Sequence, residues 1–378
     1  MIIQRSLQKA IYNRMFKGKA ILLFGPRQCG KSTLIHQILE DRPFLYLNGD
    51  EGSTREALTN TNVPLLKTII GNHNIVFIDE AQRIPNIGLT LKIITDQIKD
   101  IQVIATASSA FELANRVNES LTGRKYEFML YPLSFAEMVT HDGFLHEKVM
   151  IEHRLIYGYY PEIVVNPGDE KYLLKSLSSS YLYKDLLVLD NIKKHSVLEK
   201  LLRALALQIG SEANVNEIAG IVGVSRLTVE KYIDLLEKAF VIFTLPALSR
   251  NVRNEIKKGR KVYFYDCGVR NAIINNFKPV SQRTDVGGLW ENFVIAERIK
   301  YLQYQGIDVK QYFWRTTQQQ EVDLIEEHEG GDLFAFEFKW NKKAKVRFPS
   351  TFVDNYPNVK TFAISPENIE TFLLKMPE

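Results

Sequence analysis

The chain has 378 residues, of which 45% are hydrophobic and 24% are charged, and its formal net charge is +4. This composition is typical of a globular protein with several packed cores, so we expect two to four domains. No apolar run approaches the roughly 18 residues that span a bilayer, and the first residues lack the apolar core of a secretory signal, so we expect a cytoplasmic protein and no membrane partner. The two cysteines, Cys29 and Cys267, exclude a disulfide framework.

Short β-rich runs alternate with helical patterns through residue 135, which is typical of a parallel sheet with helices on both faces. The first domain, residues 1–140, is therefore expected to have an α/β fold. We expect its strands at 20–24, 44–48, 75–79, 102–107 and 126–130.

A P-loop, or Walker A, motif follows the first expected strand. Its pattern is Gly25-x-x-x-x-Gly30-Lys31-Ser32, and a helix-like run comes directly after it. Glycines let successive backbone N–H groups turn toward phosphate oxygens, and the helix N-terminus adds partial positive charge. Lys31 is expected to reach the β- and γ-phosphates of ATP, and the Ser32 hydroxyl to bind Mg²⁺. The residues predicted to bind the nucleotide in this loop are Gly25, Pro26, Arg27, Gln28, Cys29, Gly30, Lys31, Ser32 and Thr33.

The third expected strand ends in two carboxylates, Asp79 and Glu80, which is the Walker B pattern. Asp79 is expected to hold Mg²⁺ through water, and Glu80 to polarise the water that attacks the γ-phosphate. Such carboxylates also occur as plain strand ends. Their position about 50 residues after a P-loop favours the ATPase interpretation.

Two further features could act on the γ-phosphate. The fourth expected strand ends in hydroxyl groups, and Thr106 or Ser108 could sense the phosphate, although helix capping by Ser108 or Ser109 is an equally good interpretation. Arg124 could act as an arginine finger within its own subunit or from a neighbouring one, whereas an arginine at the surface is the commoner case. A finger from a neighbour would require a homo-oligomer.

Four segments together resemble a known family. In chain order they are Gly25-Pro-Arg-Gln-Cys-Gly-Lys-Ser-Thr33, Phe77-Ile-Asp-Glu-Ala-Gln-Arg83, Ser120-Leu-Thr-Gly-Arg124 and Leu130-Tyr-Pro-Leu-Ser-Phe135. This ordered set resembles the prokaryotic AAA-type ATPases that carry a C-terminal domain of unknown function. The resemblance implies an ATPase core followed by a helical region, a winged helix and a nuclease-like fold. Ala107 departs from the glycine that relatives often carry, which leaves the sensor residue open.

Residues 141–210 are expected to form a helical lid or connector, and residues 211–280 a winged helix-turn-helix. Helix-turn-helix units need a tight turn and a capped second helix, and here Gly223 supplies the turn and Ser225 the cap. The inward stripe of the second helix is expected to consist of Val229, Ile233 and Leu236.

Basic residues near this unit favour a nucleic-acid partner, with DNA as the preferred candidate. The second helix exposes Arg226, Thr228 and Lys231, which are residue types that contact phosphates or base edges. The runs 241–245 and 261–265 are expected to form a hairpin, or wing. A solvated face or a protein-docking winged helix is the alternative. Apart from the acidic Glu255, the charged residues of the arm are Arg250, Arg253, Lys257, Lys258, Arg260 and Lys261.

Residues 281–378 are expected to form an α/β domain with a helix at 288–300. Alternation along a strand puts Glu337 and Lys339 on one face. If Asp323 lies on the neighbouring strand, two carboxylates and an ammonium converge, which suits Mg²⁺. Lys339 would then orient or deprotonate water for attack on a phosphodiester, and Glu291 would approach from the helix as an additional ligand. The expected strands are 312–315, 321–325 and 333–340.

This spacing is a weak signal by itself, because Glu-x-Lys recurs at Glu255-Ile-Lys257. The arrangement resembles the PD-(D/E)XK, or restriction-endonuclease-like, fold, and the resemblance implies a metal site for Mg²⁺ or Mn²⁺. Lys339 can neutralise only one of two buried carboxylates, so we expect a second positive charge, for which a divalent cation is the natural candidate. A retained fold that only binds DNA or packs on the ATPase is the alternative.

The sequence leaves two hypotheses for the function. In the first, a Mg²⁺-dependent ATPase is coupled to a DNA-binding and DNA-cleaving C-terminal region. In the second, the ATPase is a nucleotide switch whose C-terminal half binds DNA or protein without cleavage. The predicted catalytic residues are Glu80, Arg124 and Lys339, and the predicted metal ligands are Ser32, Asp79, Glu291, Asp323 and Glu337.

Overall fold

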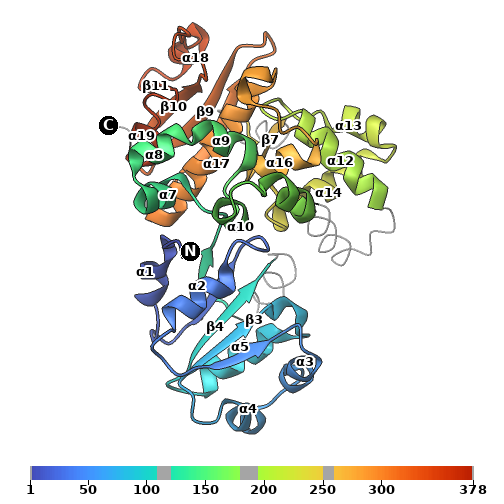
Figure 1. Ribbon diagram of the computed structural model, residues 1–378, viewed down its shortest axis with the longest axis vertical. Coiled ribbons are helices and arrows are strands. Elements are labelled where there is room, and N and C mark those ends of the chain that lie inside the picture. The colour runs from blue at the N-terminus through green and yellow to red at the C-terminus, as the bar shows by residue number, and fades with distance from the viewer. Residues whose placement is uncertain (1, 109–120, 179–194, 250–258, 377–378) are drawn as a thin grey trace.

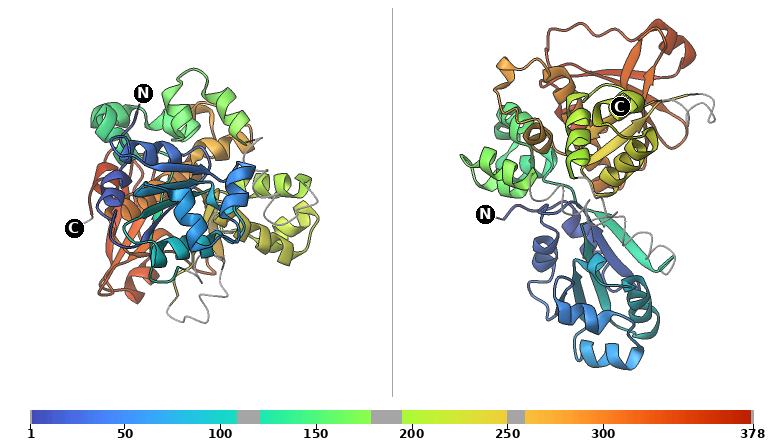
Figure 2. Two further views of the ribbon diagram at one scale, coloured as in Figure 1. Left: turned by 90° about the horizontal axis from the view of Figure 1, so that it is seen from below. Right: turned by 90° about the vertical axis from the view of Figure 1, so that its right-hand side faces the viewer.

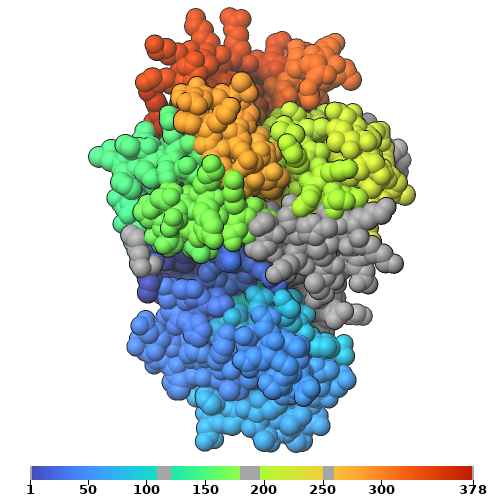
Figure 3. All heavy atoms as spheres, turned by 45° about the vertical axis from the view of Figure 1, so that its right-hand side comes forward, coloured from blue at the N-terminus to red at the C-terminus, as the bar shows by residue number. Residues whose placement is uncertain are grey.

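The computed structural model describes residues 2–108, 121–178, 195–249 and 259–376. Figure 1 shows two lobes, of which the lower holds the N-terminal sheet and the upper holds the middle and C-terminal segments. The N-terminus lies where the lobes meet, and the side view in Figure 2 shows an elongated outline. In the space-filling view, the green middle segment lies directly above the blue N-terminal lobe (Figure 3).

A five-stranded parallel sheet in the order β2-β3-β4-β1-β5 forms the centre of the lower lobe. The five predicted strands agree with the observed ones to within one residue at each end. Strands β1, β3 and β4 are buried along their whole length, as expected of parallel strands covered on both faces. The strands are β1 (Ala20–Phe24), β2 (Leu45–Asn48), β3 (Ile75–Asp79), β4 (Gln102–Ala107) and β5 (Lys125–Met129).

Alternate residues of β1 enter two different cores, because successive side chains of a strand point to opposite faces. Leu22 packs in a core with residues of α4 and α5, whereas Ile21 packs in a core with residues of α1 and α2. Helices therefore cover both faces of the sheet, as the sequence predicts. The helices of this lobe are α1 (Leu7–Tyr12), α2 (Lys31–Ile38), α3 (Gly52–Leu58), α4 (Val63–Ile70), η1 (Ala81–Arg83) and α5 (Ile87–Gln97).

The middle of the chain is helical and ends in an antiparallel hairpin. Gly223 has a left-handed backbone (φ 77°) at the end of α13, and the Ser225 hydroxyl accepts a hydrogen bond from Thr228 N at 3.2 Å at the start of α14. The stripe predicted for α14 is buried. The elements are α7 (Phe135–Asp142), α8 (Phe144–Val149), α9 (Ile151–Tyr157), α10 (Pro161–Val165), α12 (His195–Leu207), α13 (Val215–Val222), α14 (Arg226–Lys238), β6 (Ile242–Pro246), β7 (Arg260–Phe264), α16 (Cys267–Ile273) and η2 (Val280–Gln282).

The C-terminal part contains a mixed sheet in the order β11-β10-β9-β8. Strands β8, β9 and β10 are antiparallel neighbours, and β11 runs parallel to β10. The long helix α17 packs on this sheet, with Trp290 and Phe293 in one core with Phe336 of β10. The elements are α17 (Val286–Gln305), β8 (Lys310–Arg315), β9 (Glu321–Glu327), β10 (Leu333–Phe338), α18 (Ser350–Asn355), β11 (Lys360–Ile364) and α19 (Glu370–Leu373).

Two hydrophobic cores run across the predicted domain limits in the upper lobe. One joins Leu174 and Leu205 to Ile218 and Val229, so the predicted boundary between residues 210 and 211 lies inside a single core. The four-part division of the chain stays a prediction. None of the helices in the described ranges is long and apolar enough to cross a membrane.

Candidate functional site

The P-loop connects β1 to α2 and holds its lysine against the loop backbone. Lys31 is buried, and its ammonium donates hydrogen bonds to the carbonyl oxygens of Gly25 and Pro26, each at 2.9 Å. A Cβ atom at position 25 would overlap the carbonyl oxygen of Leu130, so the close approach of the two backbones requires glycine there. The backbone of Leu130, which follows β5, thus packs directly against the P-loop at Gly25.

The remaining predicted residues of this loop differ in exposure. Cys29 is buried and donates its S–H to Leu130 O at 3.4 Å, and Gly30 begins α2 with a left-handed backbone. Arg27 is half-buried, whereas Gln28 and Thr33 are exposed. Gln28 and Thr33 are therefore the residues of this set that are most exposed to solvent.

The structure joins the P-loop to the Walker B strand. Ser32 Oγ donates a hydrogen bond to Asp79 Oδ2 at 2.7 Å, and the Tyr46 hydroxyl donates to the same oxygen at 3.2 Å. The Thr106 hydroxyl donates to the other carboxylate oxygen of Asp79. A hydroxyl and a carboxylate at this separation are the oxygen donors that Mg²⁺ prefers, so the two predicted ligands fit this ion.

Glu80 lies beside Ser108 and a glutamine that sequence reasoning missed. Glu80 has an uncommon left-handed backbone (φ 49°). Its carboxylate accepts hydrogen bonds from Gln82 Nε2 at 2.5 Å and Ser108 Oγ at 3.3 Å. Gln82 Oε1 is buried and has no hydrogen-bond partner among the residues the structure describes. The only signal for Gln82 in the sequence is its place within the segment that carries the family resemblance.

The two candidate sensors contact different carboxylates. Thr106 Oγ1 accepts a hydrogen bond from Glu80 N at 3.2 Å while its hydroxyl bonds to Asp79. Ser108 contacts the side chains of Glu80 and Gln82. Ser109, the other candidate cap, lies outside the described residues.

Arg124 lies at the wrong edge of the sheet to act as a finger within its own subunit. Its carbonyl oxygen accepts a hydrogen bond from Ala20 N at 2.9 Å, at the amino end of β1, whereas the P-loop follows the carboxyl end. A strand rises about 3.3 Å per residue, so β1 alone separates the two ends by about 13 Å. The guanidinium instead pairs with Asp96 at 2.6 Å near the surface. The prediction of a finger in cis is wrong, and a finger from a neighbouring subunit stays a prediction.

Arg5 connects the P-loop to the C-terminal part of the chain, and no motif in the sequence indicates this role. Its buried guanidinium donates to Cys29 O at 2.7 Å, to Tyr131 O at 2.6 Å and to Glu137 Oε1 at 3.1 Å. The Tyr304 hydroxyl, from α17, accepts from Tyr131 N at 3.0 Å and from Arg5 at 3.4 Å. A single side chain therefore contacts both a P-loop carbonyl and the long helix of the C-terminal part.

The C-terminal sheet brings together three of the residues that the sequence selects. Lys339 follows β10, and its ammonium donates to Glu337 Oε2 at 2.6 Å and lies 3.8 Å from Asp323 Oδ2. Asp323, on β9, also accepts a hydrogen bond from Phe338 N at 2.9 Å. Burial raises the pKa of both carboxyl groups, and Lys339 opposes this rise. Two carboxylates and one ammonium thus converge at one place on the sheet.

Glu291 binds a lysine that we predicted to be exposed in the basic arm. Lys261 is fully buried, and its ammonium donates to Glu291 Oε1 at 2.8 Å and pairs with Glu321. The Tyr263 hydroxyl donates to the same oxygen of Glu291 at 2.5 Å. The nucleic-acid contact predicted for the basic arm does not extend to Lys261, because its ammonium is buried against Glu291 of α17 and Glu321 of β9. Arg260 is half-buried, and the rest of the arm lies outside the described residues.

Lys261 brings a second positive charge to this group of carboxylates. Ligand atoms of Glu291, Glu321 and Asp323 all lie within 4.8 Å of one another, and Lys261 forms ion pairs with two of these residues. Burial raises the pKa of Glu291 to about 7, and Lys261 opposes the rise. Two lysines, Lys261 and Lys339, thus face the four carboxylates Glu291, Glu321, Asp323 and Glu337, so the divalent cation stays a prediction. Carboxylate oxygens at Asp323 and Glu337 fit Mg²⁺ or Mn²⁺ by type, whereas Glu291 already has a lysine as its counter-ion.

The chain is similar in sequence to known families along most of its length. Residues 17–139 match the AAA domain family, and residues 149–280 and 286–370 match two domains of unknown function, DUF8612 and DUF4143. An uncharacterized protein of Mycobacterium tuberculosis is 24% identical over 344 residues, which cover 90% of this chain and 74% of the relative. An uncharacterized protein of Haemophilus influenzae is 26% identical over 315 residues, covering 74% of each chain. The winged helix and the nuclease-like fold are not part of these matches and stay predictions.

A solved structure shows the same fold over most of the chain. The Walker-type ATPase of Pyrococcus abyssi is 16% identical, with a TM-score of 0.50, and the match covers 72% of this chain and 96% of that one. At this identity the likeness concerns the fold alone. Together, the matched AAA domain, the P-loop and Walker B geometry and the shared fold support an AAA-type ATPase in the N-terminal part of the chain.

Proposed function

We propose that the chain is a Mg²⁺-dependent ATPase whose nucleotide site is coupled to a DNA-binding C-terminal half. The observation that carries the ATPase part is the 2.7 Å hydrogen bond between Ser32 Oγ and Asp79 Oδ2. It joins two motifs that are 47 residues apart and puts both predicted ligands of one ion at the carboxyl edge of the sheet. Ligands of open α/β sheets bind at this edge.

The residues of this site divide the work of hydrolysis. The P-loop amides and Lys31 bind the phosphates of ATP, and Ser32 and Asp79 hold Mg²⁺, which neutralises charge on the phosphate oxygens when bound. Glu80 orients the attacking water and accepts its proton. Gln82 holds the Glu80 carboxylate, and its unpartnered Oε1 offers that water a second acceptor.

The contacts of Arg5 support coupling between the nucleotide site and the C-terminal half of the chain. Its guanidinium contacts the carbonyl of Cys29, so a change in the P-loop backbone on ATP binding would move a hydrogen bond of Arg5. Arg5 also contacts Tyr304 of α17, the helix that carries Glu291. A movement of the Arg5 guanidinium would therefore change contacts in both lobes, with Cys29 in the P-loop and with Tyr304 of α17.

Exposed cations on α14 support DNA as the partner of the C-terminal half. Arg226 and Lys231 lie on the exposed side of this helix, and Ser225 caps its first turn. Arginine and lysine at such positions contact phosphates, and residues of a second helix can read base edges in the major groove. The antiparallel hairpin of β6 and β7 follows this helix directly, as in the predicted wing.

The carboxylate cluster, which consists of Glu291, Glu321, Asp323 and Glu337, supports two versions of this function. Asp323, Glu337 and Lys339 converge as a hydrolytic site for a phosphodiester requires, which favours cleavage. Lys261 favours the second version, in which the C-terminal half binds without cutting, because its ammonium already pairs with Glu291, a predicted metal ligand, and with Glu321. We therefore propose DNA binding for both versions and cleavage for the first alone.

Calorimetric titration of ATP in the presence of Mg²⁺ tests the nucleotide site. Lys31→Ala should abolish measurable binding, whereas Glu80→Gln should bind ATP like the wild type. Lys67→Ala, on α4 away from the P-loop, is the matched control and should change nothing. Unimpaired binding by Lys31→Ala would remove the basis of the proposal.

Incubation of the full chain with labelled DNA, ATP and Mg²⁺ or Mn²⁺ separates the two versions. Products that disappear in Asp323→Ala would establish cleavage at the cluster. Intact DNA under all these conditions, with DNA binding retained, would leave the version without cleavage.

A further inference from the structure

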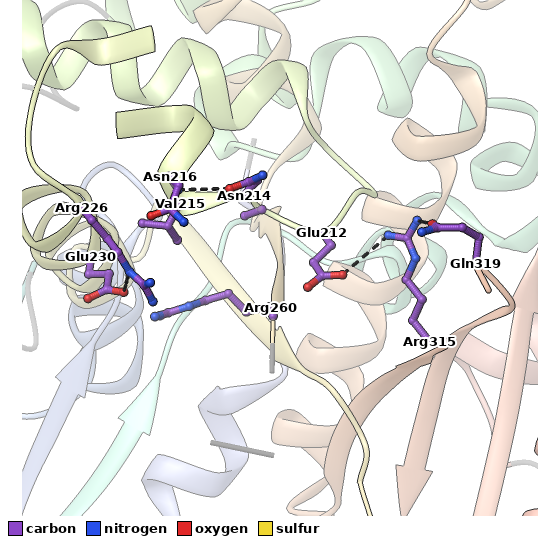
Figure 4. Close-up of a pocket in the computed structure, with 11 residues that line it drawn as sticks. Glu212, Asn214, Val215, Asn216, Arg226, Glu230, Arg260, Arg315 and Gln319 are labelled. Carbon is purple, nitrogen blue, oxygen red and sulfur yellow. Dashed lines mark hydrogen bonds and ion pairs between the residues drawn. The ribbon is translucent and has the colours of Figure 1, made fainter. Parts of the chain in front are cut away.

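A pocket lined by three arginines lies where the helical middle segment meets the C-terminal sheet (Figure 4). Its volume is about 650 Å³, and we call it the arginine pocket. Arg226 is the first residue of α14, Arg260 the first of β7 and Arg315 the last of β8. Three parts of the chain that are distant in sequence therefore each contribute one guanidinium to the same cavity.

The arginine pocket has hydrogen-bonding capacity that the protein does not use. Arg226 Nε donates to Glu230 at 3.0 Å, and Arg315 Nη1 lies 3.8 Å from a carboxylate oxygen of Glu212. Arg260 has no ion-pair partner for its guanidinium within the residues the structure describes, and Figure 4 shows it pointing toward Arg226. Arg315 Nε is buried and likewise lacks a hydrogen-bond partner in the described ranges. Glu212 and Glu230 in the lining and Glu321 beside Arg315 equal the three cations in number, so the unused capacity lies at Arg260 and at Arg315 Nε.

This chemistry selects a phosphate-bearing ligand. Guanidinium groups are planar forks that match phosphate oxygens with two parallel hydrogen bonds, and they remain charged at all physiological pH values. Arg226 is already paired with Glu230, whereas Arg260 beside it has no ion-pair partner in the described ranges, so a bound anion would gain the attraction of Arg260. A cavity of this volume exceeds a single phosphate, so it accommodates a stretch of backbone with its sugars.

The arginine pocket adjoins the carboxylate cluster. Arg315 Nε lies 3.6 Å from Glu321 Oε2 on the neighbouring strand. Glu321 and Asp323 are two residues apart on β9, and therefore on the same face of the sheet. Lys261, which follows Arg260 in β7, pairs with Glu321. A strand held by Arg315 would thus lie beside Glu321, on the face of β9 that carries Asp323.

We propose that the arginine pocket binds the phosphodiester backbone of a nucleic-acid strand and directs that strand to the carboxylate cluster. This inference rests on the proposed DNA-binding function and specifies where the strand lies. It assigns Arg260 and Arg315 to backbone contacts, which fix position and carry no sequence information. Binding at this pocket is therefore independent of base sequence.

Fluorescence anisotropy with the full chain and a labelled single-stranded DNA of 20 nucleotides tests the inference. Arg260→Gln and Arg315→Gln should each weaken binding about tenfold near 0.1 M NaCl and reduce the slope of log affinity against log salt by about one. Lys310→Gln is the matched control, because Lys310 lies at the opposite end of β8 from Arg315 and is 73% exposed. The control should match the wild type in affinity and slope. Within the described residues the Arg260 guanidinium has no ion pair to lose, so its variant should also melt like the wild type.

The possible outcomes separate this inference from the function on which it rests. Wild-type protein that binds no DNA, single-stranded or duplex, would overturn both the proposed function and the pocket. DNA binding by the wild type with unchanged affinity and slope in both arginine variants would overturn the pocket alone. Displacement of the DNA by polyglutamate as readily as by unlabelled DNA of equal charge would also overturn the pocket, because an acidic protein would then serve equally well.

Discussion

Replacement of Lys261 by methionine tests whether a lysine, rather than a metal ion, balances the C-terminal carboxylates. Methionine preserves most of the length of the side chain and removes its charge. The ammonium is fully buried and contacts Glu291 at 2.8 Å as well as Glu321. Removing one partner of a buried ion pair costs about 3–5 kcal/mol, because the other charge is left uncompensated. Glu291 keeps its hydrogen bond from Tyr263, so we expect a loss of about 3 kcal/mol, at the lower end of this range.

Urea unfolding followed by tryptophan fluorescence measures this loss in the relevant part of the chain. All three tryptophans lie in the C-terminal part, at Trp290, Trp314 and Trp340, so the signal reports on that part. Adding Glu291→Gln to Lys261→Met should recover at least half of the lost stability, because the two residues are in contact.

Lys310→Met and a titration with Mn²⁺ provide the controls. Lys310 forms an exposed pair with Glu327 at 3.7 Å, and its replacement should cost less than about 0.5 kcal/mol. Without ATP, Mn²⁺ should stabilise Lys261→Met more than the wild type, because the cation can replace the missing ammonium in the variant alone. Equal losses in the Lys261 and Lys310 variants, or an equal response of the wild type to Mn²⁺, would refute the reasoning.

Three further predictions concern coupling, subunit contacts and acid stability. Arg5→Lys should still bind ATP in calorimetry but should lose the change in tryptophan fluorescence that ATP causes in the wild type. Lysine cannot replace the contacts that the forked guanidinium makes with three partners. An undiminished fluorescence change would mean that the coupling does not depend on Arg5. Arg124→Ala should hydrolyse ATP at the wild-type rate in dilute protein, since the arginine cannot reach the phosphates of its own subunit. A loss of ATPase activity that is restored by an excess of Lys31→Ala subunits would instead establish an arginine finger in trans. Burial disfavours the ionised Asp285, but hydrogen bonds from Arg283 and Arg270 outweigh it and lower its pKa to about 2. Its contribution to stability is thus present above pH 4 and is lost as the pH falls toward 2, so the advantage of the wild type over Asp285→Asn in urea unfolding should shrink by about 2 kcal/mol over that range, and a constant difference would contradict this account.

The strands and the nucleotide motifs could be predicted because local sequence determines them. Buried parallel strands are continuous apolar runs bounded by turn residues, and Ala20–Phe24 and Ile75–Asp79 are of this kind. The P-loop and Walker B patterns require particular residues at fixed spacing, so they are recognisable without the fold. The same holds for Gly223 and Ser225, whose turn and cap depend on their immediate neighbours.

Arg5 and Lys261 could not be found in this way, because their partners are distant in sequence. Arg5 contacts Glu137 across 132 residues, and Lys261 contacts Glu291 across 30. No periodicity or motif records such a pair before the topology is known. The basic run around Lys261 also suggested the wrong environment for this residue. A lysine in such a run is usually solvated, but here the alternation of side chains along β7 turns it toward the interior.

The error at Arg124 has a different cause. The predicted strand at 126–130 already places this arginine at the amino end of a parallel strand. Ligands of such sheets bind at the carboxyl ends, so the topology implied by the strand prediction excludes a finger in cis. The family resemblance suggested a role for the segment that contains Arg124, but the geometry of the sheet determines whether its side chain can reach the phosphates.

Phosphate release from ATP in the presence of Mg²⁺, measured for the wild type and for Glu80→Gln, tests the central claim most directly. Glu80 is held beside Ser108 and Gln82 at the end of β3, and a positioned general base contributes about 10²- to 10⁴-fold to a rate. The account predicts steady hydrolysis by the wild type and at least a hundredfold slower release by Glu80→Gln with ATP affinity unchanged. Equal rates for the two proteins, or no hydrolysis by the wild type, would contradict it.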